Sequence, residues 1–129
     1  MEIKTGIKGY TELTVTDAMS AKELGSGLLP VYSTPSLVAM MENTCSNSML
    51  DYMDEGWGTV GISLDIKHTA ATPIGMKVHA ESELIEVDGR RLVFEVKAYD
   101  ECGEIGHGRH ERFIINNEKF MSRVNAKLG

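Results

Sequence analysis

Residues 34–53, TPSLVAMMENTCSNSMLDYM, form the stretch that decides the fold. Its first two residues predict the start of a helix, because the hydroxyl of Thr34 can act as the N-cap and Pro35 suits the first helical position. The principal apolar stripe comprises Leu37, Val38, Met41, Cys45, Met49 and Tyr52. Three further apolar positions widen it, namely Ala39, Met40 and Leu50. A helix this apolar is expected to be wrapped by the rest of the protein, and Gly56 and Gly58 are expected to end it.

Most of the chain outside this helix alternates between apolar and polar residues, as β-strands do. One strand is predicted before the helix and four after it, at residues 9–15, 59–68, 76–87, 91–100 and 103–115. Asp88-Gly89 predicts a hairpin between two of the later strands. Asn117 is expected to cap a short terminal helix that contains Phe120 and Val124.

Three of the later strands have one apolar face. The residues on these faces are Val60, Ile62, Leu64 and Ile66, then Val78, Ala80, Ser82 and Leu84, then Leu92, Phe94, Val96 and Ala98. An antiparallel sheet with one polar face, curled around one apolar helix, buries both elements. The sequence therefore predicts an α+β protein of the hotdog type, with residues 1–129 as a single domain.

The bulk composition limits the possible functions. The net charge of −6 argues against non-specific nucleic-acid binding, and no apolar run approaches the roughly 20 residues that span a membrane. The N-terminus has no signal-peptide core, so a cytoplasmic location is expected. Cys45 and Cys102 form neither a disulfide framework nor a zinc pattern. Residues 17–33 are predicted to be a loop with room for a short helical turn, and a connection that long is often a lid or binding loop.

His68 has the same parity as Leu64 and Ile66, so alternation directs its side chain towards the helix. A polar group on that face needs a partner or a function. The alternative is an ordinary strand-end histidine whose hydrogen bonds are satisfied.

Glu42 is also unexpected, because it lies within the apolar stripe of the helix. Its carboxylate should pair with a charged group, hold its proton unusually tightly, or face a wet cavity; alternatively, it lies at the edge of the stripe and reaches solvent. Thr34 precedes it by a little over two turns and shares nearly the same face, although capping alone could explain the threonine. A hydroxyl, a carboxylate and an imidazole near a helix N-terminus are suited to acyl transfer.

The last long strand offers weaker candidates. His107 and His110 should face opposite sides of the strand, so no shared metal site is expected. Arg112 lies on the same face as His110 and two glycines, Gly106 and Gly108. This bare patch could let a ligand or a neighbouring subunit approach closely.

The runs HTAATPIGMKVHAESELIEVDGRR (residues 68–91) and DECGEIGHGRHERFIINNEKF (residues 100–120) closely resemble the fluoroacetyl-CoA thioesterases and their relatives, which are hotdog enzymes. The likeness extends over residues 34–127. The resemblance implies an acyl-CoA thioesterase that acts as a homodimer and needs neither metal nor prosthetic group. By the same resemblance, Thr34, Glu42 and His68 are the catalytic residues, Gly61 lines the acyl pocket, and Arg112 belongs to the ligand region.

The segment before the helix departs from the family pattern. Fluoroacetyl specificity in the family is linked to a phenylalanine-rich lid, whereas residues 23–34 read ELGSGLLPVYST, without phenylalanine. A different small or medium acyl group is therefore expected. Two other functions stay open: a non-catalytic hotdog protein that binds acyl-CoA or another small hydrophobic ligand, and a hydratase that acts on an enoyl thioester.

Overall fold

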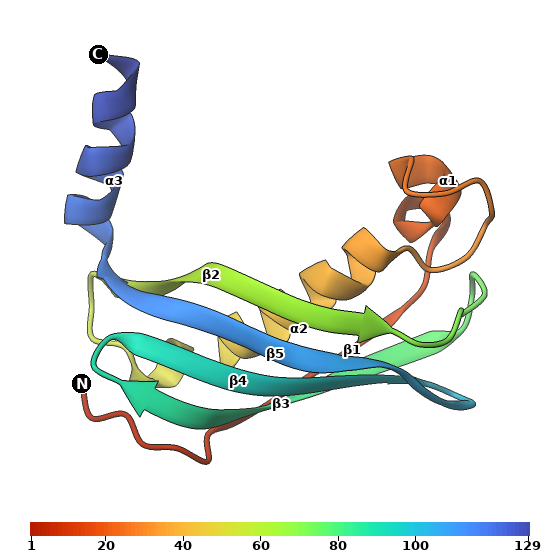
Figure 1. Ribbon diagram of the computed structural model, residues 1–129, viewed down its shortest axis with the longest axis horizontal. Coiled ribbons are helices and arrows are strands. Elements are labelled where there is room, and N and C mark those ends of the chain that lie inside the picture. The colour runs from red at the N-terminus through yellow and green to blue at the C-terminus, as the bar shows by residue number, and fades with distance from the viewer.

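Five strands form one antiparallel sheet in the order β1-β3-β4-β5-β2 in the computed structural model, which describes residues 1–129 (Figure 1). The elements are β1 (Lys8–Thr14), α1 (Ala21–Leu24), α2 (Thr34–Ser48), β2 (Trp57–His68), β3 (Lys77–Asp88), β4 (Arg91–Asp100), β5 (Gly103–Asn116) and α3 (Asn117–Asn125), with 3-10 turns at Asp17–Met19, Leu50–Tyr52 and Ala126–Leu128. All five predicted strands are present, and the predicted order of strand, long helix and four strands is confirmed.

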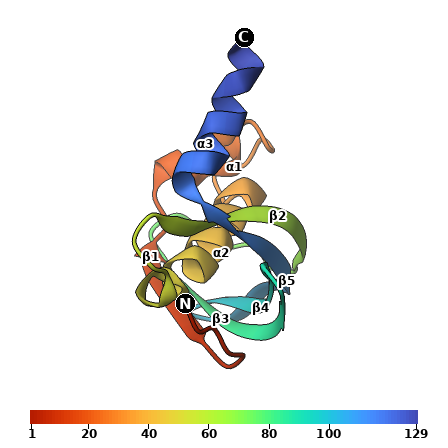
Figure 2. The ribbon, with the colours of Figure 1, turned by 90° about the vertical axis from the view of Figure 1, so that its left-hand side faces the viewer.

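The sheet curls around α2, which the end-on view in Figure 2 shows inside the curve of the strands. The predicted apolar faces of β3 and β4 are buried, and their residues are Val78, Ala80, Ser82, Leu84, Leu92, Phe94, Val96 and Ala98. They pack against α2 through Leu37, Met41 and Cys45, which are completely buried. The predicted hotdog arrangement, an antiparallel sheet around one long helix with a short C-terminal helix, is confirmed. No helix is long and apolar enough to cross a membrane.

The helix is less completely wrapped than predicted. It ends at Ser48, and the following 3-10 turn leaves Leu50 64% and Tyr52 44% exposed. Ala39 is exposed on the side of α2 that faces away from the sheet. The predicted apolar stripe is therefore too wide, because Ala39 lies at the surface and Leu50 and Tyr52 lie in the turn beyond the end of the helix. A further shift of one residue occurs at α3, where Asn116 rather than Asn117 is the N-cap and accepts a hydrogen bond from the Lys119 amide.

A β-bulge in β2 reverses the faces of that strand. Gly61 pairs with Arg112, but the next pair is Ser63 with Glu111, so Ile62 is an extra residue. A bulge of one residue exchanges the inward and outward sides of everything beyond it. The prediction that Val60 and Ile62 share the apolar face with Leu64 and Ile66 is consequently wrong. Val60 lies beside the exposed Phe113 on the outer face, and the side chain of Ile62 is 52% exposed. Gly61 faces α2 before the bulge, whereas Leu64, Ile66 and His68 face it afterwards.

The glycine patch of β5 serves packing within the chain. A Cβ atom at Gly106 would lie 3.0 Å from Leu37 Cδ2 and 3.4 Å from Met41 Cε, so side chains of α2 already occupy this space. The expectation that a ligand or a second subunit approaches there is therefore wrong at Gly106, where the close neighbours are the Lys67 carbonyl of β2 and side chains of α2.

Candidate active site

The end of β2 and the start of α2 bring two of the candidate residues together. Thr34 Oγ1 lies 2.8 Å from His68 Nδ1, which is a hydrogen-bond distance. Ser33, rather than Thr34, is the N-cap of α2, and its Oγ accepts a hydrogen bond from the Ser36 amide. Because Ser33 does the capping, the Thr34 hydroxyl is free for His68. Capping therefore does not account for Thr34.

The imidazole of His68 is held as a neutral base. Its Nε2 is buried and has no hydrogen-bond partner, and the ring as a whole is partly buried. Burial lowers the pKa of His68 below its ordinary value, and the backbone of Ala70 offsets part of that effect. A neutral ring with one nitrogen on a hydroxyl can accept the proton of that hydroxyl or of a nearby water.

Residues 17–33 form part of the wall beside this pair. A pocket of about 310 Å³ beside Thr34 and His68 is lined by Ala21, Ser26, Val31, Tyr32, Ser33, Thr34, His68, Thr69, Ala70 and Ala71. The segment is tied down by isolated β-bridges from Ser20 to Tyr32 and from Val31 to Pro73. Its tip is nevertheless open, because Leu28 is 90% and Leu29 65% exposed. A larger hollow of about 480 Å³ contains none of the candidate residues and lies across β1, β3 and β4.

Glu42, Gly61 and Arg112 meet at a second point along α2. A Cβ atom at Gly61 would lie 2.9 Å from Glu42 Oε2 and 3.5 Å from Arg112 Nη1. Glu42 is partly buried and forms no hydrogen bond or salt bridge within the chain. The expected charge pairing of Glu42 is therefore not found; the residue is partly buried at the edge of the buried face, as the alternative predicted, and its carboxylate lies beside Gly61.

Arg112 is 7% exposed and is held by β2 and by a histidine. Its Nε donates to Thr59 Oγ1 at 2.8 Å, its Nη2 donates to the Thr59 carbonyl at 2.9 Å, and its Nη1 lies 3.1 Å from His110 Nε2. Burial lowers the pKa of Arg112, and the neighbouring Cys45 and Glu42 offset that effect. An arginine side chain remains charged under such conditions.

The two groups are separate within one chain. Thr34 and Glu42 lie eight residues apart on α2, which is about 12 Å along the helix axis. No hydrogen bond joins Glu42 to Thr34 or to His68. The structure thus unites Thr34 with His68, and Glu42 with Gly61 and Arg112, without uniting the two sets.

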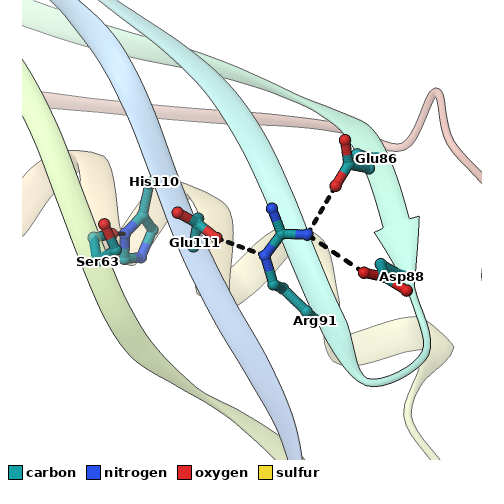
Figure 3. A network of polar contacts seen from close by, with 6 residues as sticks. All are labelled: Ser63, Glu86, Asp88, Arg91, His110 and Glu111. Atoms are coloured by element: carbon teal, nitrogen blue, oxygen red, sulfur yellow. Dashed lines mark hydrogen bonds and ion pairs between the residues drawn. The ribbon is translucent and has the colours of Figure 1, made fainter.

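Two residues of this region were missed from the sequence. Ser33 was overlooked because Thr34 has the same capping chemistry, and His110 was given no function although its shared face with Arg112 was recognised. His110 is 1% exposed, and its Nδ1 lies 2.9 Å from the Ser63 carbonyl (Figure 3). Its neighbour His107 lies on the opposite face beside Glu104, as predicted. Cys45 is no nucleophile, because burial raises its pKa to about 12.

The exchange of roles between Ser33 and Thr34 leads to a stability prediction. Replacing Ser33 with alanine should lower the free energy of unfolding by about 1 kcal/mol, the usual effect of losing an N-cap. Thr34→Val should change it by only about 0.5 kcal/mol or less, because the Thr34 side chain is exposed and caps nothing. Urea denaturation of both variants checks this. A larger loss for Thr34→Val would mean that threonine is the cap.

Comparison with known proteins gives a consistent family. Residues 15–118 match the family FlK, described as fluoroacetyl-CoA-specific thioesterase. The fluoroacetyl-CoA thioesterase of Streptantibioticus cattleyicolor is 43% identical over 97 residues, which are 75% of this chain and 70% of that protein.

Solved structures agree in fold over nearly the whole chain. A mutant of the fluoroacetyl-CoA thioesterase FlK in complex with acetyl-CoA superposes with a TM-score of 0.93 at 33% identity, covering 98% of this chain and 100% of that one. A hot-dog-like protein from Thermanaerovibrio acidaminovorans is 22% identical and has a TM-score of 0.88, with coverage of 97% and 93%, which supports the fold alone. Because the family match spans most of the chain, this protein belongs to the FlK family of fluoroacetyl-CoA-specific thioesterases.

Proposed function

We propose that this protein is an acyl-CoA thioesterase that hydrolyses a small or medium acyl thioester to a carboxylate and free CoA. The observation that carries the proposal is the 2.8 Å contact between Thr34 Oγ1 and His68 Nδ1 at the start of α2. It occurs in a chain whose family is named for thioester hydrolysis. CoA is part of the substrate, and the reaction needs no other cofactor.

In the proposed reaction, the thioester carbonyl lies near the first amides of α2 of one chain, and the backbone of Gly61 that completes the site comes from the second chain of the proposed dimer. Amides at a helix N-terminus, with the positive end of the helix dipole, stabilise the negative charge that develops on the carbonyl oxygen. Thr34 or Glu42 supplies or orients the nucleophile, which is either a side-chain oxygen or a water molecule. When water or the Thr34 hydroxyl attacks, its oxygen bonds to the carbonyl carbon, His68 takes up the proton, the carbon–sulfur bond breaks, and His68 returns the proton to the departing thiolate of CoA. A Glu42 carboxylate that attacks directly gives up no proton, so the thiolate leaves unprotonated or takes its proton from water. An acyl group bonded to Thr34 or Glu42 is then released as the carboxylate by attack of a water molecule that gives its proton to His68.

We also propose that the enzyme acts as a homodimer, in which the sheets join edge to edge. The strand β2 supports this, because it lies at the edge of the sheet and exposes Ile62. The separation of Glu42 from the Thr34–His68 pair supports it too. In a dimer, the carboxylate of one chain can approach the pair of the other; otherwise, the substrate must bridge both sets within one chain.

The acyl group is proposed to differ from fluoroacetyl. The S. cattleyicolor relative is named for fluoroacetyl-CoA, and an FlK mutant has been crystallised with acetyl-CoA. The exposed tip of the lid presents Leu28 and Leu29, and the lid has no phenylalanine; its one aromatic residue, Tyr32, is 1% exposed. Aliphatic side chains suit a plain acyl chain, whereas they offer no ring edge to a fluorine atom. The cytoplasmic location remains a prediction, which fractionation of expressing cells would check.

Release of free thiol from acyl-CoAs of increasing chain length tests the function. We expect turnover with a maximum at a short or medium acyl group, and weaker turnover of fluoroacetyl-CoA. Saturable CoA-ester binding without thiol release would favour the non-catalytic binding protein. Addition of water to an enoyl thioester without thiol release would favour a hydratase.

The pH dependence of hydrolysis follows from the environment of His68. Its pKa is lowered, so the neutral base persists to below the ordinary value of 6.5 and is lost only as the pH falls further. We therefore expect kcat/KM to be constant near neutral pH and to fall on the acid side with a midpoint below 6.5. A midpoint above 6.5 would contradict a buried, neutral His68.

Gly61→Ala tests the contact with Glu42. The added methyl group would lie 2.9 Å from Glu42 Oε2 and 3.1 Å from His110 Cε1, so the flexible carboxylate must move. We expect kcat to fall by about tenfold or more, because a displacement of about 1 Å can have such an effect. The free energy of unfolding should change by about 1 kcal/mol or less. Ser122→Ala, at an exposed position of α3 outside the site, is the control and should retain kcat.

A further inference from the structure

Two buried side chains of β5 reach across to β2 on either side of its bulge. Arg112 Nη2 donates to the Thr59 carbonyl at 2.9 Å, and His110 Nδ1 lies 2.9 Å from the Ser63 carbonyl. Gly61 and the extra residue Ile62 lie between these two carbonyls. A bulge interrupts the regular ladder of backbone hydrogen bonds, so side-chain donors can take over part of that function.

The two side chains are also joined to each other, and this fixes the protonation of the ring. A guanidinium group only donates hydrogen bonds, so His110 Nε2 must be the acceptor in its 3.1 Å contact with Arg112 Nη1. The hydrogen of the neutral ring is then on Nδ1, where it is donated to Ser63. Arg112, His110 and Ser63 thus form one chain of hydrogen bonds in which each donor points to the next acceptor. His110 is 1% exposed and Arg112 is 7% exposed.

The outer face of the same strand is organised separately. Glu111, between the two residues, turns the other way and accepts a hydrogen bond from Arg91 Nε at 2.6 Å (Figure 3). Arg91 also pairs with Glu86 at 2.7 Å. The ion pair of Glu111 with Arg91 therefore holds β5 to β4 on the surface, whereas His110 and Arg112 hold β5 to β2 on the inner face.

We propose that His110 and Arg112 act together as positioning residues that hold the bulge of β2 and so keep Gly61 turned towards Glu42. This inference rests on the proposed function, in which Gly61 lines the acyl site. Without the bulge, alternation would exchange Gly61 for a neighbour on the inner face. The branched side chain of Ile62 would then occupy space in which even a methyl group comes within 2.9 Å of Glu42 Oε2.

This role differs from direct recognition of the ligand by Arg112. Three of its five N–H groups are already used by Thr59 and His110, and almost none of the side chain is exposed. Loss of a direct contact would chiefly raise KM, since it weakens binding of substrate and transition state alike. Loss of the positioning function should instead lower kcat, because Gly61 and Glu42 would move.

The protonation of His110 can be observed directly in the wild-type protein. We expect long-range ¹H–¹⁵N spectra to show a neutral ring with its hydrogen on Nδ1, the less common tautomer, at neutral pH. The charged and titratable groups near this ring are Arg112 and Glu111 on β5 and Glu42 on α2. A ring that carries its hydrogen on Nε2, or a doubly protonated ring, would overturn the proposed chain of hydrogen bonds.

Arg112→Lys tests the consequence for the site, since lysine keeps the charge but lacks the planar fork. We expect altered amide resonances at Gly61, Ile62 and Ser63, and a kcat about tenfold or more below wild type with KM changed by about twofold or less. Glu111→Gln, on the outer face of the same strand, is the control and should leave both unchanged. Unaltered amide resonances with a raised KM would overturn the proposal.

The proposed function and this inference can fail independently. If the wild-type protein hydrolyses no acyl-CoA, the tautomer of His110 and the amide resonances of residues 61–63 still decide whether His110 and Arg112 hold the bulge of β2. If hydrolysis occurs but Arg112→Lys leaves those resonances and kcat unchanged, only the positioning role is wrong. His110→Gln gives a second variant, which can still accept from Arg112 but cannot hold Ser63 with the same geometry.

Discussion

Replacement of His68 by alanine is expected to lower kcat/KM for acyl-CoA hydrolysis by about 10²- to 10⁴-fold, the usual contribution of a positioned general acid or base. The reason is the 2.8 Å contact of its Nδ1 with Thr34 Oγ1 and the burial that keeps the ring neutral. No other histidine contacts Thr34, so none can replace it. Thiol release under single-turnover conditions measures the effect on the chemical step.

A matched control for His68→Ala is His79→Ala on β3. His79 stacks between the rings of Tyr10 and Tyr99, with centroid distances of 5.3 Å and 5.0 Å, and has no contact with Thr34. The same change of residue type should therefore leave hydrolysis near the wild-type rate. If His68→Ala also retained the wild-type kcat/KM, the Thr34–His68 pair would have no catalytic function.

Most of the fold was predictable because burial in this chain follows simple periodicity. Alternating residues of β3 and β4, such as Leu84 and Phe94, are completely buried, and their pattern has no interruption visible in the sequence. The helix start was located to within one residue because Thr34-Pro35 is chemically distinctive. The N-cap residue itself could not be identified from the sequence, because Ser33 and Thr34 both carry a hydroxyl group. Only the backbone geometry shows that Ser33 is the N-cap.

The bulge in β2 marks the limit of such reasoning. Val60, Ile62, Leu64 and Ile66 alternate perfectly in sequence, yet the structure inserts an extra residue at Ile62. A bulge depends on hydrogen bonds from the neighbouring strand, here from His110 and Arg112, which are 47 and 53 residues from their partners. Local pattern contains no information about such distant contacts.

Long-range contacts also limited how much of the candidate site could be predicted from the sequence. His68 was predicted to face α2 because it has the same parity as Leu64 and Ile66. The prediction is confirmed, because all three residues lie on the same side of the bulge and keep the same alternation. Gly61 could be assigned to the pocket only through the family resemblance, because strict alternation would turn it outwards. The sequence also indicated one cluster of three candidate residues, whereas the structure separates Glu42 from Thr34 and His68 by two turns of α2.

Glu42→Gln is expected to lower kcat by about 100-fold or more, because glutamine preserves the shape of the side chain but is neither a base nor a nucleophile. The free energy of unfolding should change little, since Glu42 forms no hydrogen bond or salt bridge within the chain that the substitution would break. Single-turnover hydrolysis together with urea denaturation separates the two effects. Near-normal kcat in a folded Glu42→Gln variant would remove the carboxylate from the mechanism.

The separation of Glu42 from His68 allows a sharper version of this experiment. Glu42→Gln and His68→Ala chains with different affinity tags can be expressed together, and the mixed dimers isolated. If each site combines Glu42 of one chain with Thr34 and His68 of the other, every mixed dimer retains one intact site and about half of the wild-type activity. Activity no higher than that of the single variants would instead mean that Glu42 and His68 of the same chain act on one substrate, which then bridges about 12 Å of α2.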